Sequence, residues 1–134
     1  MNMPSDDIKD LLEQWDLGLT FTDNLFVGRE PSSPNNTTTV FDTSGAGPFR
    51  TYNKDERFHQ AAIQIRVRNA SYLQAMTLSQ DILSYLDGAA NQEVNQAYYG
   101  IIAALDHPFL LDWDENDRAR VVTNYEIQRR EIGG

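Results

Sequence analysis

Residues 61–88 read AAIQIRVRNASYLQAMTLSQDILSYLDG, and residues 119–130 read ARVVTNYEIQRR. In the first segment Ile63, Ile65 and Val67 alternate with polar residues. This two-residue period is typical of a half-buried strand. The second segment alternates in the same way. The sequence therefore predicts two strands, each of which buries one face and exposes the other.

A helix is predicted directly after the first of these strands. Ser71 offers an N-cap side chain, apolar residues at helical spacing continue to Leu86, and Gly88 follows as a stop signal. We expect Met76, Leu83 and Leu86 to face the sheet. The strand and the helix together indicate a small packed α/β unit.

The other predicted elements flank this unit on both sides. Their apolar patterns and turn residues define each range. They comprise a helix at Ser5–Trp15 and strands at Leu19–Val27, Thr37–Asp42, Val94–Leu105 and Phe109–Trp113. The glycines and Pro in 44–48 are expected to end the strand that precedes them.

These elements predict one α/β (α+β) domain that spans residues 1–134. Its core is a mostly antiparallel sheet of about four to five strands, with two helices on one face. Residues 29–57 are rich in Pro, Gly, Ser and Asn and are predicted as a long loop or an extended hairpin. Phe49 and Tyr52 are candidate interface anchors in this segment, which we expect to be mobile in the free subunit and ordered on assembly.

The composition excludes several kinds of chemistry. The chain has no cysteine, so disulfides, thiolate metal sites and cysteine nucleophiles are excluded. Its two histidines, His59 and His107, do not stand at metal-ligand spacing. The acidic run 112–117 resembles the start of a calcium loop, but Asp117 stands where glycine is required, so a hairpin turn is the better interpretation. We predict a protein that is not an enzyme and uses no cofactor or metal.

The net charge of −9 limits the partners. A protein that coats duplex DNA needs basic patches to neutralise phosphates, so this class is excluded. No apolar run approaches the ~20 residues that span a bilayer, and the N-terminus lacks the regions of a signal peptide. We expect synthesis in a cytoplasm and no membrane partner. A small acidic binding or inhibitor module stays an alternative.

Four arginines are candidate interface residues. Arg66 and Arg68 stand two apart on one predicted strand, and Arg118 and Arg120 stand two apart on another. If these strands pair, a basic stripe forms on the sheet face away from the helices. Two interpretations stay open. The arginines balance nearby carboxylates, or they form a contact surface for an acidic partner such as a second copy of this chain.

The order of these elements resembles that of the tail-terminator and minor capsid (tail completion) proteins of long-tailed bacteriophages. The segments that carry the resemblance are the strand Ala62–Arg68, the helix Ser71–Leu86 with its Leu-Asp-Gly ending, the strand Tyr99–Ala104, the stretch Pro108–Asp112 and the closing strand Arg120–Arg130. The leucine-rich helix at the N-terminus is similar too.

The resemblance implies a subunit that forms a hexameric ring and belongs to the virion, in the tail or neck. Such a ring caps the growing tail tube, ends polymerisation of the tube protein and joins the tail to head-completion or neck proteins. Genomic DNA passes through its lumen without specific binding, and an acidic wall suits this passage because like charges repel phosphates. A head-to-tail connector protein is the alternative within the same class.

Overall fold

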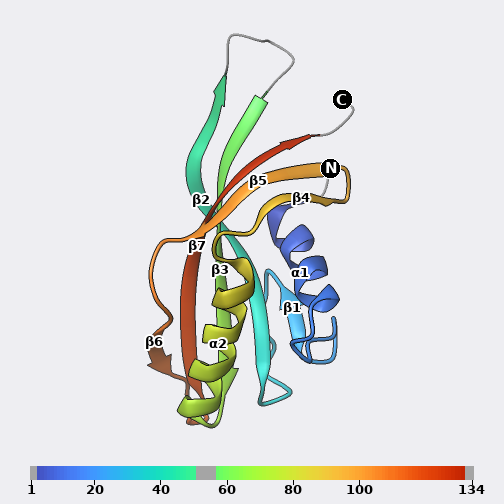
Figure 1. Cartoon of the computed structure of the whole chain (residues 1–134). Coiled ribbons are helices and arrows are strands. Elements are labelled where there is room, and N and C mark those ends of the chain that lie inside the picture. The colour runs from blue at the N-terminus through green and yellow to red at the C-terminus, as the bar shows by residue number, and fades with distance from the viewer. Residues whose placement is uncertain (1–2, 51–56, 132–134) are drawn as a thin grey trace.

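The computed structural model describes the backbone of residues 3–50 and 57–131, and the side chains of residues 3–43 and 60–130. Two helices lie on one face of a curled sheet (Figure 1). In chain order the elements are α1 (Pro4–Gln14), β1 (Leu25–Val27), β2 (Thr37–Arg50), β3 (Arg57–Asn69), α2 (Tyr72–Leu86), β4 (Ala90–Val94), β5 (Ala97–Ala104), β6 (Phe109–Trp113) and β7 (Ala119–Glu131).

The sheet is mixed but almost wholly antiparallel. Its strand order is β1-β2-β3-β7-β5-β4, and β6 pairs with β7 outside this path. Among the described pairs, β1 with β2 is the parallel one. The predicted α+β class is confirmed, but the predicted number of strands was too low, because the described part of the chain forms a 7-stranded sheet.

One additional strand is β4, which lies just before the region predicted as the single strand Val94–Leu105 and forms a hairpin with β5. β4 and β5 pair antiparallel, with Val94 opposite Ala97. The two residues between them, Asn95 and Gln96, both have positive φ, at 51° and 65°. This is the geometry of a two-residue hairpin turn, which usually contains glycine. The missing glycine explains why the sequence pattern gave no turn signal here.

β2 also runs further than predicted. It continues through the glycine-rich segment that was expected to end it, and the register with β3 changes from Thr43–Ala62 to Gly47–Gln60. A bulge of this kind absorbs extra residues without ending the pairing. The two strands project beyond the rest of the sheet (Figure 1), and we call residues 43–50 and 57–60 the β2–β3 arm. Tyr52 lies outside the described residues.

The core lies between the helices and the sheet. The buried residues of α2 are Ala75, Ser79, Ile82 and Leu86, which pack toward the same cluster as the apolar face of β3 and β7. The Ser71 hydroxyl accepts a hydrogen bond from the Gln74 N–H at 3.3 Å, which confirms the predicted N-cap. The predicted inner face was right for Leu86 but too far round the helix, because Met76 and Leu83 are only partly buried.

This helix orientation gives a first prediction. Replacing the buried Ile82 by alanine is expected to lower the free energy of unfolding by about 2–5 kcal/mol, because a cavity forms under the sheet. The neighbouring change Leu83→Ala is the matched control and should cost clearly less, since Leu83 is only partly buried. Urea denaturation followed by circular dichroism measures both. An equal loss for the two variants would contradict this orientation.

The start of α1 is fixed by a residue of β2. The helix begins at Pro4, and its N-cap Met3 provides no side-chain hydrogen bond. Asp42 takes that role from outside, since its carboxylate accepts the Ser5 backbone N–H at 3.0 Å and the Ser5 hydroxyl. Ser5, the first residue of the predicted helix, lies inside the first turn of the observed one. The helix is thereby attached to the central sheet at its positive end.

A buried carboxylate attaches the same helix to the other side of the sheet. Asp7 is fully buried and accepts hydrogen bonds from the Tyr99 hydroxyl, from Arg129 Nη2 at 3.1 Å and from Asn95 Nδ2 at 2.8 Å. The pKa of Tyr99 is raised, mainly by burial and secondly by the hydrogen bond to Asp7. The network joins α1 to β5, to β7 and to the β4–β5 turn.

Neither helix of the described residues has the length and apolar composition needed to cross a membrane.

Candidate interaction surface

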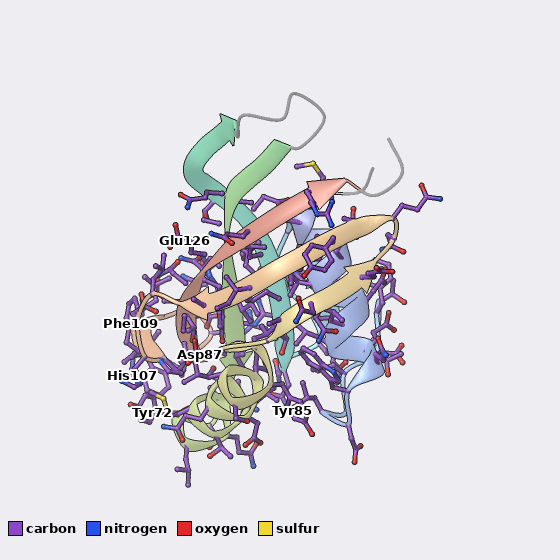
Figure 2. The ribbon with its side chains drawn as sticks, turned by 45° about the horizontal axis from the view of Figure 1, so that its top comes forward. Tyr72, Tyr85, Asp87, His107, Phe109 and Glu126 are labelled. Carbon is purple, nitrogen blue, oxygen red and sulfur yellow. The ribbon has the colours of Figure 1, made fainter. Side chains whose placement is uncertain are left out.

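Exposed large apolar side chains are concentrated, among the described residues, on β6 and the segment just before it. Five large side chains there are 37–59% exposed, namely Leu105, Phe109, Leu110, Leu111 and Trp113. We call these residues the β6 surface. In Figure 2, Phe109 and His107 lie along the same side of the molecule as Tyr72 of α2. Apolar side chains that gather in this way are typical of a protein–protein contact rather than of ordinary surface.

The topology explains why this surface is exposed. β3 pairs with β7 from Ala119 to Arg129, so β6 has to lie on the opposite side of β7. β5 occupies that side only from Tyr125 onward. β6 is therefore a short edge strand with β7 as its single partner in the described part of the chain. An open strand edge with apolar side chains favours association.

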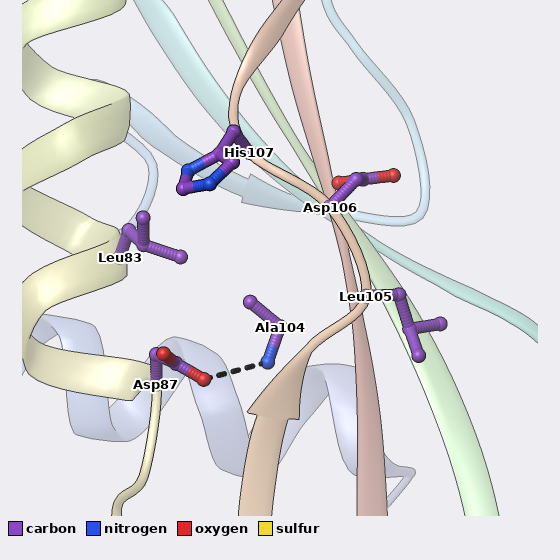
Figure 3. A pocket seen from close by; sticks show the side chains of 6 residues that line it. All are labelled: Leu83, Asp87, Ala104, Leu105, Asp106 and His107. Atoms are coloured by element: carbon purple, nitrogen blue, oxygen red, sulfur yellow. Dashed lines mark hydrogen bonds between the residues drawn. The ribbon is translucent and has the colours of Figure 1, made fainter.

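A shallow groove of about 250 Å³ separates α2 from the segment that leads into β6 (Figure 3). Its lining residues are Leu83, Asp87, Ala104, Leu105, Asp106 and His107. The two acidic side chains of this lining accept hydrogen bonds that fix the segment between β5 and β6. Asp87 Oδ1 accepts the Ala104 N–H at 2.9 Å, and Asp106 accepts the backbone N–H of Asn124 at 3.0 Å and its side-chain N–H at 2.9 Å.

On the other side of β6, three of the predicted arginines come together. We call Arg68, Arg118 and Arg120 the arginine cluster. Arg118 is buried, its Nε lies 2.7 Å from Asp114 Oδ2, and its Nη1 donates to the Ser32 carbonyl oxygen at 2.7 Å. These contacts fix the β6–β7 turn against the loop between β1 and β2.

The other two arginines bind a shared carboxylate in the same loop. Arg68 Nη1 lies 3.2 Å from Glu30 Oε1 and Arg120 Nη1 lies 3.4 Å from the same atom. Arg68 Nη2 also donates to the Pro34 carbonyl oxygen at 2.7 Å. Arg120 Nε lies 2.6 Å from Asp112 Oδ1. Each arginine of the cluster therefore has a carboxylate partner in its own chain.

The acidic run after β6 forms the predicted turn between strands. Asp114 Oδ1 accepts the N–H groups of Asn116 at 3.0 Å and Arg118 at 2.9 Å. Burial raises the pKa of Asp114, but these hydrogen bonds and the Arg118 guanidinium outweigh it, so the pKa lies below its usual value. No group of three or more acidic or histidine side chains arranged to hold a metal ion occurs among the described residues.

Arg66 differs from the arginine cluster. It is half-buried on the sheet face away from the helices, with its guanidinium 4.9 Å from the centre of the Phe41 ring. Its Nη2 donates to Gln64 Oε1 at 3.3 Å. Within residues 3–43 and 60–130, no carboxylate lies at ion-pair distance from Arg66. Phe49 is a β2 residue in the arm, where the register places it opposite Phe58.

The family model described as bacteriophage tail terminator protein matches residues 6–131. A chain in a structure of the virion of a native gene transfer agent particle has a TM-score of 0.68 at 12% identity, over 94% of this chain and 93% of that one. A second solved structure, of a protein without a descriptive name, has a TM-score of 0.57 at 9% identity, over 97% and 92%. No curated protein matches.

Proposed function

Because this chain belongs to the bacteriophage tail terminator family, we propose that it forms a homohexameric ring that caps the phage tail tube. The ring ends polymerisation of the tube protein and joins the tail to head-completion or neck proteins. The family is a structural one rather than a catalytic one. The observation that carries the proposal is the family match over residues 6–131, which is nearly the whole chain.

The fold likeness supports a role in an assembled particle. The similar chain with the TM-score of 0.68 comes from the virion of a gene transfer agent. A subunit of such a particle acts through the shape and chemistry of its surfaces. The exposed apolar residues of the β6 surface suit this mode of action.

The charge suits a ring through which DNA passes. The chain carries a net charge of −9. An acidic lumen repels phosphates, so that DNA slides through without specific binding. We also propose that the predicted interface residues Arg66 and Phe49 contact a neighbouring subunit, because Arg66 has no carboxylate at ion-pair distance within residues 3–43 and 60–130 and Phe49 lies on the arm.

Native mass and tube length test this function together. Sedimentation velocity of the full chain, alone and with tail tube protein, should give a hexameric species. Addition of the chain to growing tubes should stop elongation, which electron microscopy measures as a shorter length distribution. A chain that stays monomeric in both settings and leaves tube length unchanged would overturn the proposal.

The same experiment separates the alternative. A head-to-tail connector protein would bind a head-completion protein and leave tube elongation unaffected. The measurement of tube length with both partners present therefore decides between the two functions.

A further inference from the structure

On each of two opposite sides of the sheet, a strand has an edge without a neighbouring strand among the described residues. β6 lies on the side of β7 away from β3. On the far side of β3, β1 covers β2 only from Thr38 to Val40. Of the described strands, β3 is therefore the one neighbour of arm residues 43–50 (Figure 1). One copy cannot bring its own arm to its own β6, but two copies can bring these edges together.

The two edges are complementary in apolar chemistry. The β6 surface presents large aliphatic and aromatic side chains on a short edge strand. The arm strands contain Phe49 and Phe58, which the β2–β3 register places opposite each other. The edge of β2 that β1 leaves unpaired in the arm offers backbone hydrogen-bonding groups to such a partner.

The two edges are also complementary in charge. Residues 105–117 contain five acidic side chains and no Lys or Arg, whereas residues 43–60, the arm segment, contain Arg50, Lys54 and Arg57 against Asp55 and Glu56, a net charge of +1. The acidic segment of one copy therefore has a sign of charge opposite to that of the arm segment of another.

Two of those carboxylates are exposed. Asp112 and Asp114 are paired with the arginine cluster, whereas Glu115 and Asp117 lie exposed in the turn after β6. Each copy carries a net charge of −9, so electrostatic attraction between two copies requires opposite charges where they meet. The acidic turn and the basic residues in the sequence of the arm segment are the candidates for this pairing.

We propose that the β6 surface binds the β2–β3 arm of a second copy of this chain. The inference rests on the proposed function, because a ring provides that second copy. The two surfaces differ and lie on opposite sides of the sheet, so the contact is head-to-tail and is repeated from copy to copy until the ring closes.

A charged substitution on the β6 surface tests the contact. Leu111→Lys should raise the concentration of half-maximal assembly at least about tenfold, because a lysine has to be buried at the interface. Ile101→Lys on β5 is the matched control, since Ile101 is 43% exposed and Leu111 is 45% exposed. Sedimentation velocity, alone and with tail tubes, measures assembly, and circular dichroism shows that both variants fold.

Cross-linking tests which surfaces meet. The chain has no cysteine, so Thr43→Cys combined with Leu111→Cys introduces one thiol at the base of the arm and one on β6. A short bis-maleimide should join the copies into a ladder that ends at the hexamer. The combination of Thr43→Cys with Ile101→Cys should give no ladder.

Each outcome bears on a different claim. If the wild type forms rings, and Leu111→Lys assembles normally without a ladder in the cysteine pair, the inference is overturned and the proposed function stands. Cross-links from position 111 to tube protein instead would assign the β6 surface to that partner and would also overturn it. A wild type that stays monomeric alone and on tubes would overturn both.

Discussion

Replacing Asp7 by alanine is expected to lower the free energy of unfolding by about 3–5 kcal/mol, because one member of a buried ion pair is removed. The carboxylate is fully buried and receives hydrogen bonds from Arg129, Tyr99 and Asn95. Without it, Arg129 loses a buried counter-charge and the Tyr99 hydroxyl loses its acceptor. Since these residues lie on β5, on β7 and in the β4–β5 turn, α1 loses its attachment to that half of the sheet.

The neighbouring acid provides the control. Asp6 lies in the same first turn of α1 but is only partly buried. Asp6→Ala removes the same charge from the helix N-terminus and should cost about 0.3–1 kcal/mol. Urea denaturation at constant pH compares the two variants. Equal losses would show that the helix dipole, and not the buried network, accounts for the effect of Asp7.

Local patterns predicted the elements whose signals lie within a few residues. The N-cap of α2 follows from Ser71, whose hydroxyl accepts from a residue only three positions along the chain. The alternation of apolar residues predicted β3 and β7, and the buried face of both strands is the predicted one. These features need no knowledge of the rest of the fold.

Elements that depend on partner strands could not be predicted in the same way. The glycines after Thr43 indicate a break, but pairing with β3 carries β2 through a bulge to Arg50. The run Phe109–Leu111 lies in a predicted strand, but it has no alternation that would show which of its side chains are exposed. Its side chains are exposed because β7 is the one described strand that pairs with β6.

The partners of the arginine cluster could not be predicted from the sequence either. The sequence places these arginines on strands and predicts which of them share a face. Asp112 and Asp114 are nearby partners, but the other partners come from a loop far away along the chain, since Arg118 donates to Ser32 across 86 positions and Arg68 meets Glu30 across 38. Only the folded structure shows that most of their hydrogen-bond donors are used within the subunit.

The second prediction with a large expected effect concerns Arg118, which is buried and paired within the subunit. Arg118→Ala is expected to lower the free energy of unfolding by about 3–5 kcal/mol. The change leaves the Asp114 carboxylate, whose side chain is 8% exposed, without its ion-pair partner and the Ser32 carbonyl without this donor. The loop between β1 and β2 should then detach from the β6–β7 turn. Denaturation in urea measures the loss of stability, and hydrogen exchange of residues 30–36 locates it.

Arg66→Ala is the matched change on the same sheet face. Arg66 packs on Phe41 and donates to Gln64, so its removal should cost about 1 kcal/mol or less. If Arg66 contacts a carboxylate of the neighbouring subunit, Arg66→Ala should instead weaken assembly while the subunit stays folded, because losing one member of a desolvated pair at an interface costs ~2–5 kcal/mol. Sedimentation velocity with circular dichroism separates the two effects. Normal assembly by Arg66→Ala would remove this residue from the interface and leave it as part of a solvated sheet face.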